Sequence, residues 1–206
     1  GIICVGTCSS YGGIPAGHGN RTGAKGFWTV SPGGGNVPHQ NSWIYQNQMT
    51  WYGKDPNRYI FNIPAVVNVP GCPPHPDWIV YPVAYYLIHG YLPTLDSYSL
   101  RPRNLFEAKG PFCGGSCANT ASRGTAPVPG DPNAEAAFLG DSGCLLHLGC
   151  NGEDTFGDCP LRGKNTLDDG SKSNWCVGSD LGSQIGNARH PCQGCIEPGF
   201  PDNTSP

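Results

Sequence analysis

The chain has 206 residues, which is enough for one domain or two small ones. Its formal net charge is −3, so no broad basic field argues for nucleic-acid binding. No apolar run reaches the roughly 20 residues that a transmembrane helix needs. Charged residues make up only 13 % of the chain, while five Trp, nine Tyr and seven Phe favour surfaces that are buried against another polypeptide.

Two apolar runs in the first half are each followed by a cysteine. Residues 2–6 (Ile-Ile-Cys-Val-Gly) precede Cys8, and residues 65–69 (Ala-Val-Val-Asn-Val) precede Cys72 in a Pro-Gly-Cys-Pro-Pro turn. Runs of this kind are typical of buried strands that end in a turn. In open parallel α/β sheets ligands bind beyond the carboxyl ends of the strands, so the two cysteines could share one site. Two unrelated buried cysteines are the alternative.

The next predicted elements are helices. A helix is predicted over residues 42–52, and a better one begins at Asp77, where apolar residues recur near helical spacing until Gly90 ends it. The second helix completes a strand–turn–helix unit with the strand before it. His75 and Asp77 either cap this helix or contact a partner. Residues 134–139 predict one or two further helical turns.

The character of the chain changes near residue 103, and we place a domain boundary there, between residues 1–103 and 104–206. The second part is rich in Gly, Pro, Ser and Asn, and six cysteines fall in the roughly fifty residues from Cys144 to Cys195. Little in that segment can form a long helix or strand. Disulfides or metal-bound thiolates must therefore hold it together.

The cysteine count favours metal over disulfides. Eleven cysteines cannot all pair within one chain, and the Cys-x-x-Cys spacing of Cys192 and Cys195 suits a metal site better than a bridge. A structural zinc site is one alternative, on Cys159, Cys176, Cys192 and Cys195, but it leaves the other seven cysteines unexplained. Iron–sulfur clusters account for nearly all of them.

Spaced motifs run in order through almost the whole chain. They are Val5-Gly6-Thr7-Cys8, Gly12-Gly13-Ile14-Pro15-Ala16, Pro70-Gly71-Cys72-Pro73-Pro74-His75-Pro76-Asp77-Trp78, Leu95-Asp96, Cys144 with Cys150 and Cys159-Pro160, and His190-Pro191-Cys192 with Cys195 and Glu197-Pro198. Together they resemble the small subunits of NiFe hydrogenases. The resemblance implies an α/β fold: the C-terminal part of a flavodoxin-like domain over residues 1–103, then an irregular, cysteine-rich iron–sulfur domain over residues 104–206.

The resemblance also implies a function. Such a chain relays electrons from H2 oxidation at the Ni–Fe centre of a partner large subunit, through three 4Fe–4S clusters, to an acceptor such as a cytochrome, a ferredoxin or a quinone-linked protein. It carries no catalytic residue of its own. A periplasmic or other extracytoplasmic location is expected. A stand-alone, multi-cluster ferredoxin-like electron carrier is the alternative.

The proximal cluster of the family takes four cysteines, and Cys8 and Cys72 match two of them. The other two belong to a Cys-x-x-Cys that does not precede Cys8 in this sequence. We expect a separate polypeptide to supply this N-terminal half of the small subunit; a sequence cropped at its N-terminus is the alternative. Two thiolates alone cannot complete a four-iron cluster.

The medial cluster is expected on four cysteines. These are Cys159, Cys176, Cys192 and Cys195. Cys176 stands where most relatives have Pro and a three-iron cluster, so the resemblance implies a 4Fe–4S cluster of lower potential here.

The distal cluster is expected on Cys113, Cys117, Cys144 and Cys150. Relatives have a His three residues before the first of their distal cysteines; here Cys113 lies four residues before Cys117 and is expected to replace that His. Two glycines between them allow the backbone to absorb the extra residue. His147 is the alternative nitrogen ligand. Cys4 is left over as an ordinary core thiol.

Overall fold

The computed structural model describes residues 2–27, 66–96, 99–107, 120–131, 133–141, 143–159 and 191–202. The chain divides into two units. Unit 1 comprises Gly1–Leu105 and Cys195–Thr204, and unit 2 comprises Phe106–Gly194. The last described residues therefore return to the unit that contains the first ones.

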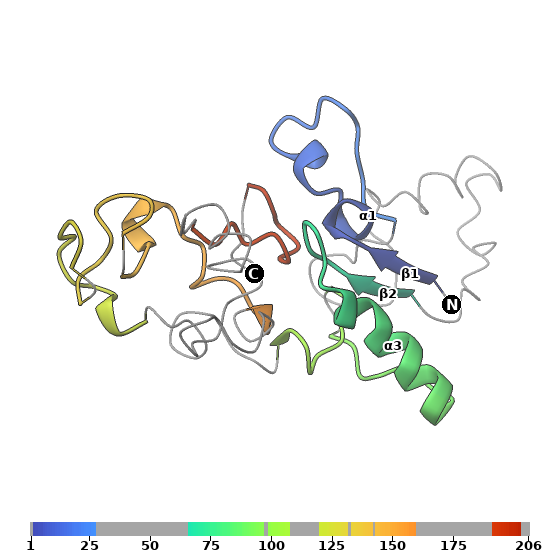
Figure 1. Ribbon diagram of the computed structural model, residues 1–206. Coiled ribbons are helices and arrows are strands. Elements are labelled where there is room, and N and C mark those ends of the chain that lie inside the picture. The colour runs from blue at the N-terminus through green and yellow to red at the C-terminus, as the bar shows by residue number, and fades with distance from the viewer. Residues whose placement is uncertain are drawn as a thin grey trace. The chain divides into compact units, whose positions relative to one another are not determined.

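Unit 1 is built on two parallel strands, β1 (Ile2–Val5) and β2 (Val66–Val69). Their register pairs Ile2 with Val66 and Val5 with Val69, so both strands end at the same edge (Figure 1). Every residue of β2 is buried, which agrees with its largely apolar, β-branched sequence. Both strands predicted from the apolar runs are confirmed.

Cys4 lies in the core of this sheet, next to Val66, with Ile2, Phe27 and Leu100 packed around them. Burial raises the pKa of the Cys4 thiol from 9.0 to about 11. A buried thiol that resists ionisation behaves as a small apolar side chain. The expectation of a core thiol is confirmed.

Each strand leads into a helix. β1 is followed by the short α1 (Thr7–Tyr11) and by η1 (Ile14–Ala16), and β2 is followed by α3 (Pro76–His89). The imidazole Nδ1 of His75 accepts a hydrogen bond of 3.1 Å from the backbone N–H of Asp77, which caps the start of α3. Gly90 ends the helix in the left-handed conformation with φ 77°. Both ends lie where the sequence predicts them, and His75 acts as a cap.

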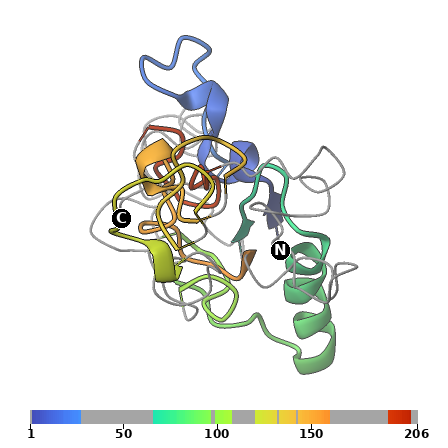
Figure 2. The ribbon, with the colours of Figure 1, turned by 60° about the vertical axis from the view of Figure 1, so that its left-hand side comes forward.

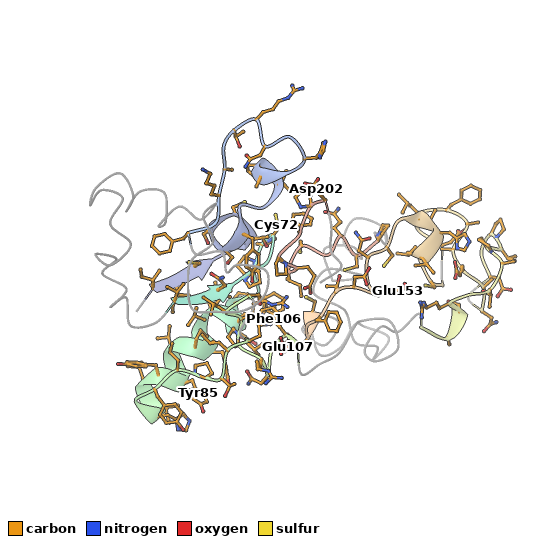
Figure 3. All side chains as sticks on the ribbon, turned by 180° about the vertical axis from the view of Figure 1, so that it is seen from behind. Cys72, Tyr85, Phe106, Glu107, Glu153 and Asp202 are labelled. Carbon is orange, nitrogen blue, oxygen red and sulfur yellow. The ribbon has the colours of Figure 1, made fainter. Side chains whose placement is uncertain are left out.

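The helix α3 is apolar on more than one side. Trp78 and Pro82 are buried, whereas Val80, Leu87 and Ile88 are exposed. No charged residue occurs between Trp78 and Ile88. Figure 3 labels Tyr85 near the exposed C-terminal end of this helix, where its ring lies 4.3 Å from that of His89. A helix that is apolar all round is normally buried on all sides in its native assembly.

Unit 2 contains little regular structure among its described residues: the short helices η4 (Thr120–Ser122) and η5 (Leu146–Leu148) and a series of turns. The helical turns predicted over residues 134–139 are wrong. The N–H of Ala136 donates to the carbonyl of Cys144 at 2.8 Å, and the N–H of Glu135 donates to the hydroxyl of Thr125 at 2.9 Å. These donors are used between loops, so they cannot form a helical ladder.

Two remaining expectations concern helices. The helix predicted over residues 42–52 lies outside the described residues. Within the described ranges no helix combines the length and the apolar character that crossing a membrane requires.

Candidate metal centre

Cys8 and Cys72 follow the two strands at the same edge of the sheet. The N–H of Gly6 donates to the carbonyl of Val69 at 2.8 Å, and the N–H of Thr7 donates to the carbonyl of Gly71 at 3.1 Å, so the pairing continues past the strand ends. Cys8 then lies in the first turn of α1, and Cys72 lies in the turn before α3 (Figure 3). Both cysteines are exposed. The edge of a parallel sheet thus presents two free thiols, as the sequence predicts.

Two glycines make room for these cysteines. Gly13 has φ +59°, and a Cβ at this position would lie 2.8 Å from the sulfur of Cys8. Gly71 has φ +145°, and a Cβ there would lie 2.4 Å from the Cα of Pro74. Side chains other than hydrogen are excluded at both positions by space and by conformation. The backbone is therefore packed closely around the Cys8 thiol and the Cys72 turn.

A third cysteine lies within electrostatic range of this pair. The pKa of the Cys72 thiol is raised, first by burial and then by the negative charges of Cys195 and Cys8. Thiolates that repel one another in this way are stabilised by bound metal groups, because a nearby cationic charge lowers the pKa of a thiol. Thiolates are the ligands that iron–sulfur groups take, and none of these three cysteines is in a disulfide.

Thr7 connects the strand-end loops to the turn that contains Cys195. Its side chain is only 1 % exposed. The hydroxyl accepts a hydrogen bond of 2.8 Å from the N–H of Gly71 and donates one to the carbonyl of Cys195. The last part of the red segment in Figure 2, residues 195–202, belongs to the same unit as Thr7. No local sequence pattern indicates this role, because the partner Cys195 is 188 residues away in the chain.

Arg101 holds the same turn from a second side. Its guanidinium donates to the Glu197 carboxylate and to the carbonyl of Ile196, both at 3.0 Å, and to the hydroxyl of Ser99 at 2.7 Å. The Asp96 carboxylate lies 3.5 Å away. Burial alone would lower the pKa of Arg101, but Tyr11, Glu197 and Asp96 outweigh it, and the pKa is raised. Arg101 therefore stays charged inside unit 1.

In unit 2, the backbone on both sides of Cys144 is fixed by hydrogen bonds. Its N–H donates to the hydroxyl of Ser122 at 2.8 Å, and its carbonyl accepts the N–H of Ala136. Gly143 precedes it with φ +103°, and a Cβ there would lie 2.0 Å from the carbonyl oxygen of Ala134. Cys144 itself is buried. Its position is therefore set by the surrounding loops rather than by a regular element.

Cys150 and Cys192 lie side by side in unit 2, although they are 42 residues apart. The sulfur of Cys150 accepts the backbone N–H of Cys192 at 3.3 Å, and the N–H of Asn151 donates to the carbonyl of Cys192 at 2.7 Å. The sulfur of Cys192 lies 3.5 Å from the hydroxyl of Thr155. Cys159 is also buried in this unit. Hydrogen bonds to cysteine sulfur are one of the factors that set iron–sulfur potentials.

His147, the alternative nitrogen ligand, is bound to a carboxylate. Its Nδ1 contacts the fully buried Glu135, while most of the imidazole is exposed. Glu135 also accepts the N–H of Gly124. His147 lies between Cys144 and Cys150 in the sequence, yet these three do not form a metal-binding group. A carboxylate bound to one imidazole nitrogen leaves the other nitrogen able to bind a metal, so His147 stays the alternative distal ligand.

The predicted ligand sets are incomplete in the described residues. Among those residues no three Cys, His, Asp or Glu side chains converge closely enough to hold a metal ion. Cys113, Cys117 and Cys176 lie outside the described ranges. Of the remaining medial ligands, Cys159 and Cys192 belong to unit 2 and Cys195 belongs to unit 1.

Two family models match the chain. Residues 1–86 match the family described as NADH ubiquinone oxidoreductase, 20 Kd subunit. Residues 131–206 match the family that describes the C-terminal part of the NiFe/NiFeSe hydrogenase small subunit. The first match defines a broad class of oxidoreductase subunits, and the second narrows that class to hydrogenase small subunits.

Similar proteins of known name point in the same direction. The chain is 31 % identical over 210 residues to the periplasmic NiFeSe hydrogenase small subunit of Desulfomicrobium baculatum, covering 99 % of this chain and 50 % of that protein. It is 30 % identical to the hydrogenase-2 small chain of Escherichia coli, covering 97 % of this chain and 40 % of that one. The crystal structure of the Desulfomicrobium baculatum NiFeSe hydrogenase matches with a TM-score of 0.59 over 99 % of this chain and 57 % of that chain, at 31 % identity.

These matches place the chain in a class of oxidoreductase subunits with a mixed α/β fold. Within that class, the chain belongs to the NiFe hydrogenase small-subunit family. It spans about half the length, or less, of the relatives that it matches.

Proposed function

We propose that this chain is the electron-transferring part of a NiFe hydrogenase. It carries electrons between the Ni–Fe centre of a partner large subunit and an external acceptor. The observation that carries this proposal is the parallel pairing of β1 with β2, which brings Cys8 and Cys72 to one sheet edge within electrostatic range of Cys195. A stand-alone ferredoxin-like carrier is not favoured, because the named relatives are hydrogenase small subunits.

The proximal site is then shared. Cys8 and Cys72 supply two thiolates, and a Cys-x-x-Cys from outside these 206 residues supplies two more. The α/β unit is correspondingly part of a flavodoxin-like domain, since the two parallel strands that the described residues form need further strands or helices for stability. The exposed apolar residues of α3, among them Leu87 and Ile88, fit this arrangement because the rest of such a domain would cover them.

The medial and distal sites follow the sequence predictions. We assign Cys159, Cys176, Cys192 and Cys195 to a medial 4Fe–4S cluster, and Cys113, Cys117, Cys144 and Cys150 to a distal one. The hydrogen bond from the N–H of Cys192 to the sulfur of Cys150 supports neighbouring positions for these two sites. We keep Cys113 as the fourth distal ligand and His147 as the alternative, since a carboxylate on Nδ1 is compatible with a metal on Nε2.

When bound, iron–sulfur clusters accept and release single electrons, and the chemistry of that step belongs to the cluster. This chain contributes the thiolates and their fixed positions. The relay has no acid or base to supply. Its residues instead set the spacing and the potentials through hydrogen bonds and burial.

The location and the acceptor are proposed from the relatives. Three of them are named as periplasmic, and the relative from Wolinella succinogenes is named as a quinone-reactive chain. We therefore propose a periplasmic enzyme whose electrons pass to a cytochrome, a ferredoxin or a quinone-linked protein.

Purification of the tagged chain from its native host tests the proposal. We expect one nickel per copy, together with a large subunit and a polypeptide segment that carries Cys-x-x-Cys. A preparation with iron but no nickel would contradict the hydrogenase assignment and support the carrier. A preparation with zinc and no iron would contradict both.

The distal assignment needs its own test. Cys113→Ala should lower the iron content and alter the distal EPR signal, while His147→Ala should leave both unchanged. Iron loss in His147→Ala, with unchanged iron content in Cys113→Ala, would assign His147 as the fourth distal ligand.

A further inference from the structure

The hydroxyl of Thr7 joins the Cys8 and Cys72 loops to the Cys195 turn through one side chain. It receives the N–H of Gly71, the residue before Cys72, at 2.8 Å. It donates to the carbonyl of Cys195 itself. Thr7 is also the covalent neighbour of Cys8. One hydroxyl therefore links the backbones of all three cysteines.

Water cannot replace this hydroxyl. Thr7 is 1 % exposed, so its Oγ1 has no access to solvent that could form an equivalent bridge. Both of its hydrogen-bonding functions are used: the oxygen accepts from one backbone and the proton is donated to another. Removing the hydroxyl would leave the N–H of Gly71 and the carbonyl of Cys195 without this partner.

A second anchor holds the turn on its other side. The carbonyl of Ile196 and the carboxylate of Glu197 each accept a hydrogen bond of 3.0 Å from Arg101. Consecutive residues of the turn are therefore fixed from two directions, Cys195 by Thr7 and the next two residues by Arg101. The turn cannot shift along or away from the sheet edge without breaking the hydrogen bond of Thr7 and those of Arg101.

We propose that Thr7, together with Arg101, is a positioning residue for electron transfer between the first two cluster sites. The two residues fix the distance of Cys195, a medial ligand, from Cys8 and Cys72, the proximal ligands. This inference rests on the proposed function. Its physical reason is that electron transfer between two redox centres slows steeply as they move apart, so a relay needs ligands that are held rigidly.

The experiment uses the purified hydrogenase complex with every polypeptide present. Thr7→Val removes the hydroxyl but keeps the shape of the side chain, and Thr7→Ser restores the hydroxyl. Thr22→Val is the matched control, because the Thr22 hydroxyl also joins two backbone groups, the carbonyl of Pro15 at 2.8 Å and the N–H of Ala24 at 3.3 Å, but lies at an exposed loop. The readouts are iron content, the EPR splitting between the reduced proximal and medial clusters, and the rate at which the medial signal appears after H2 is added.

For Thr7→Val we expect wild-type iron content, a changed or lost splitting and a several-fold slower medial signal. Thr7→Ser and Thr22→Val should match the wild type in all three. A Thr7→Val enzyme with wild-type splitting and rate would overturn the inference and leave the proposed function intact. A wild-type complex without EPR-active clusters would overturn both.

A second variant keeps the test decisive if Thr7→Val fails to assemble. Glu197→Gln retains the shape of the second anchor and the Thr7 hydroxyl while removing the charge that binds Arg101. It should change the splitting relative to the wild-type enzyme. An unchanged splitting in a fully loaded Glu197→Gln enzyme would overturn the inference.

Discussion

Arg101 offers the sharpest test of the structure of unit 1. It bonds Glu197 at 3.0 Å and lies 3.5 Å from Asp96, and these carboxylate residues are 1 % and 3 % exposed. Arg101→Leu would remove the Arg101 guanidinium from two buried carboxylates. Removing one partner of a buried ion pair typically costs about 3–5 kcal/mol, because the remaining charge stays desolvated. We expect a loss in that range for the free energy of unfolding.

Urea unfolding of the complex, followed by hydrogen exchange and mass spectrometry of peptides from unit 1, measures this loss. The control is Arg123→Leu, because Arg123 and Glu153 form an ion pair in which the side chains are 40 % and 39 % exposed. Such a surface pair contributes about 0–1 kcal/mol. Adding Asp96→Asn and Glu197→Gln to Arg101→Leu should recover part of the loss. An Arg101→Leu protein as stable as the control variant would refute the reasoning.

Single residues give three further predictions. Gly13→Ala should lower the iron content and slow the alkylation of Cys8, since the added Cβ would lie 2.8 Å from its sulfur; unchanged loading and reactivity would argue against this packing. Cys4 should resist alkylation in the folded protein until the pH approaches its pKa of about 11; mass spectrometry of labelled Cys4 checks this, and rapid labelling at pH 9 would contradict it. The contribution of Cys4 to stability should be complete below pH 9 and decline between about pH 9 and 11, because only the unfolded state ionises in that range. Cys176→Pro should convert the medial site to a three-iron cluster with a higher potential, visible by EPR in the oxidised enzyme, and a persistent four-iron cluster would show that Cys176 is not a ligand.

The strands and the long helix of unit 1 could be predicted from local patterns. The two apolar runs form β1 and β2, and α3 ends at Gly90 as its spacing predicts. These elements depend on side chains that are close in sequence, so the sequence alone carries their signal. The cap formed by His75 also follows from its position just before the helix.

The loops could not be predicted in the same way. Residues 134–139 have a helical composition, but their N–H groups donate to Thr125 and Cys144. Cys8 lies in α1 rather than on the strand that holds Cys4, because Gly6, with φ +89°, turns the chain first. Tertiary partners decide such segments, and a propensity argument does not contain them.

In the candidate site, too, some residues could be predicted from local patterns and others could not. The spacing of the motifs indicates Cys8, Cys72 and Cys195, whereas the roles of Thr7 and Arg101 do not appear in any local pattern. Both residues act through partners that are 95 or more positions away, Arg101 on Ile196 and Thr7 on Cys195. Only a folded chain brings such groups together.

The central claim is that the cysteines of this chain bind iron–sulfur clusters as an electron relay. Iron and acid-labile sulfide analysis of the purified complex tests it most directly. Three four-iron clusters, the first completed by two cysteines from outside this chain, predict about a dozen irons and as many sulfides per copy of the chain. A complex with few or no irons, or with iron but no labile sulfide, would contradict the account.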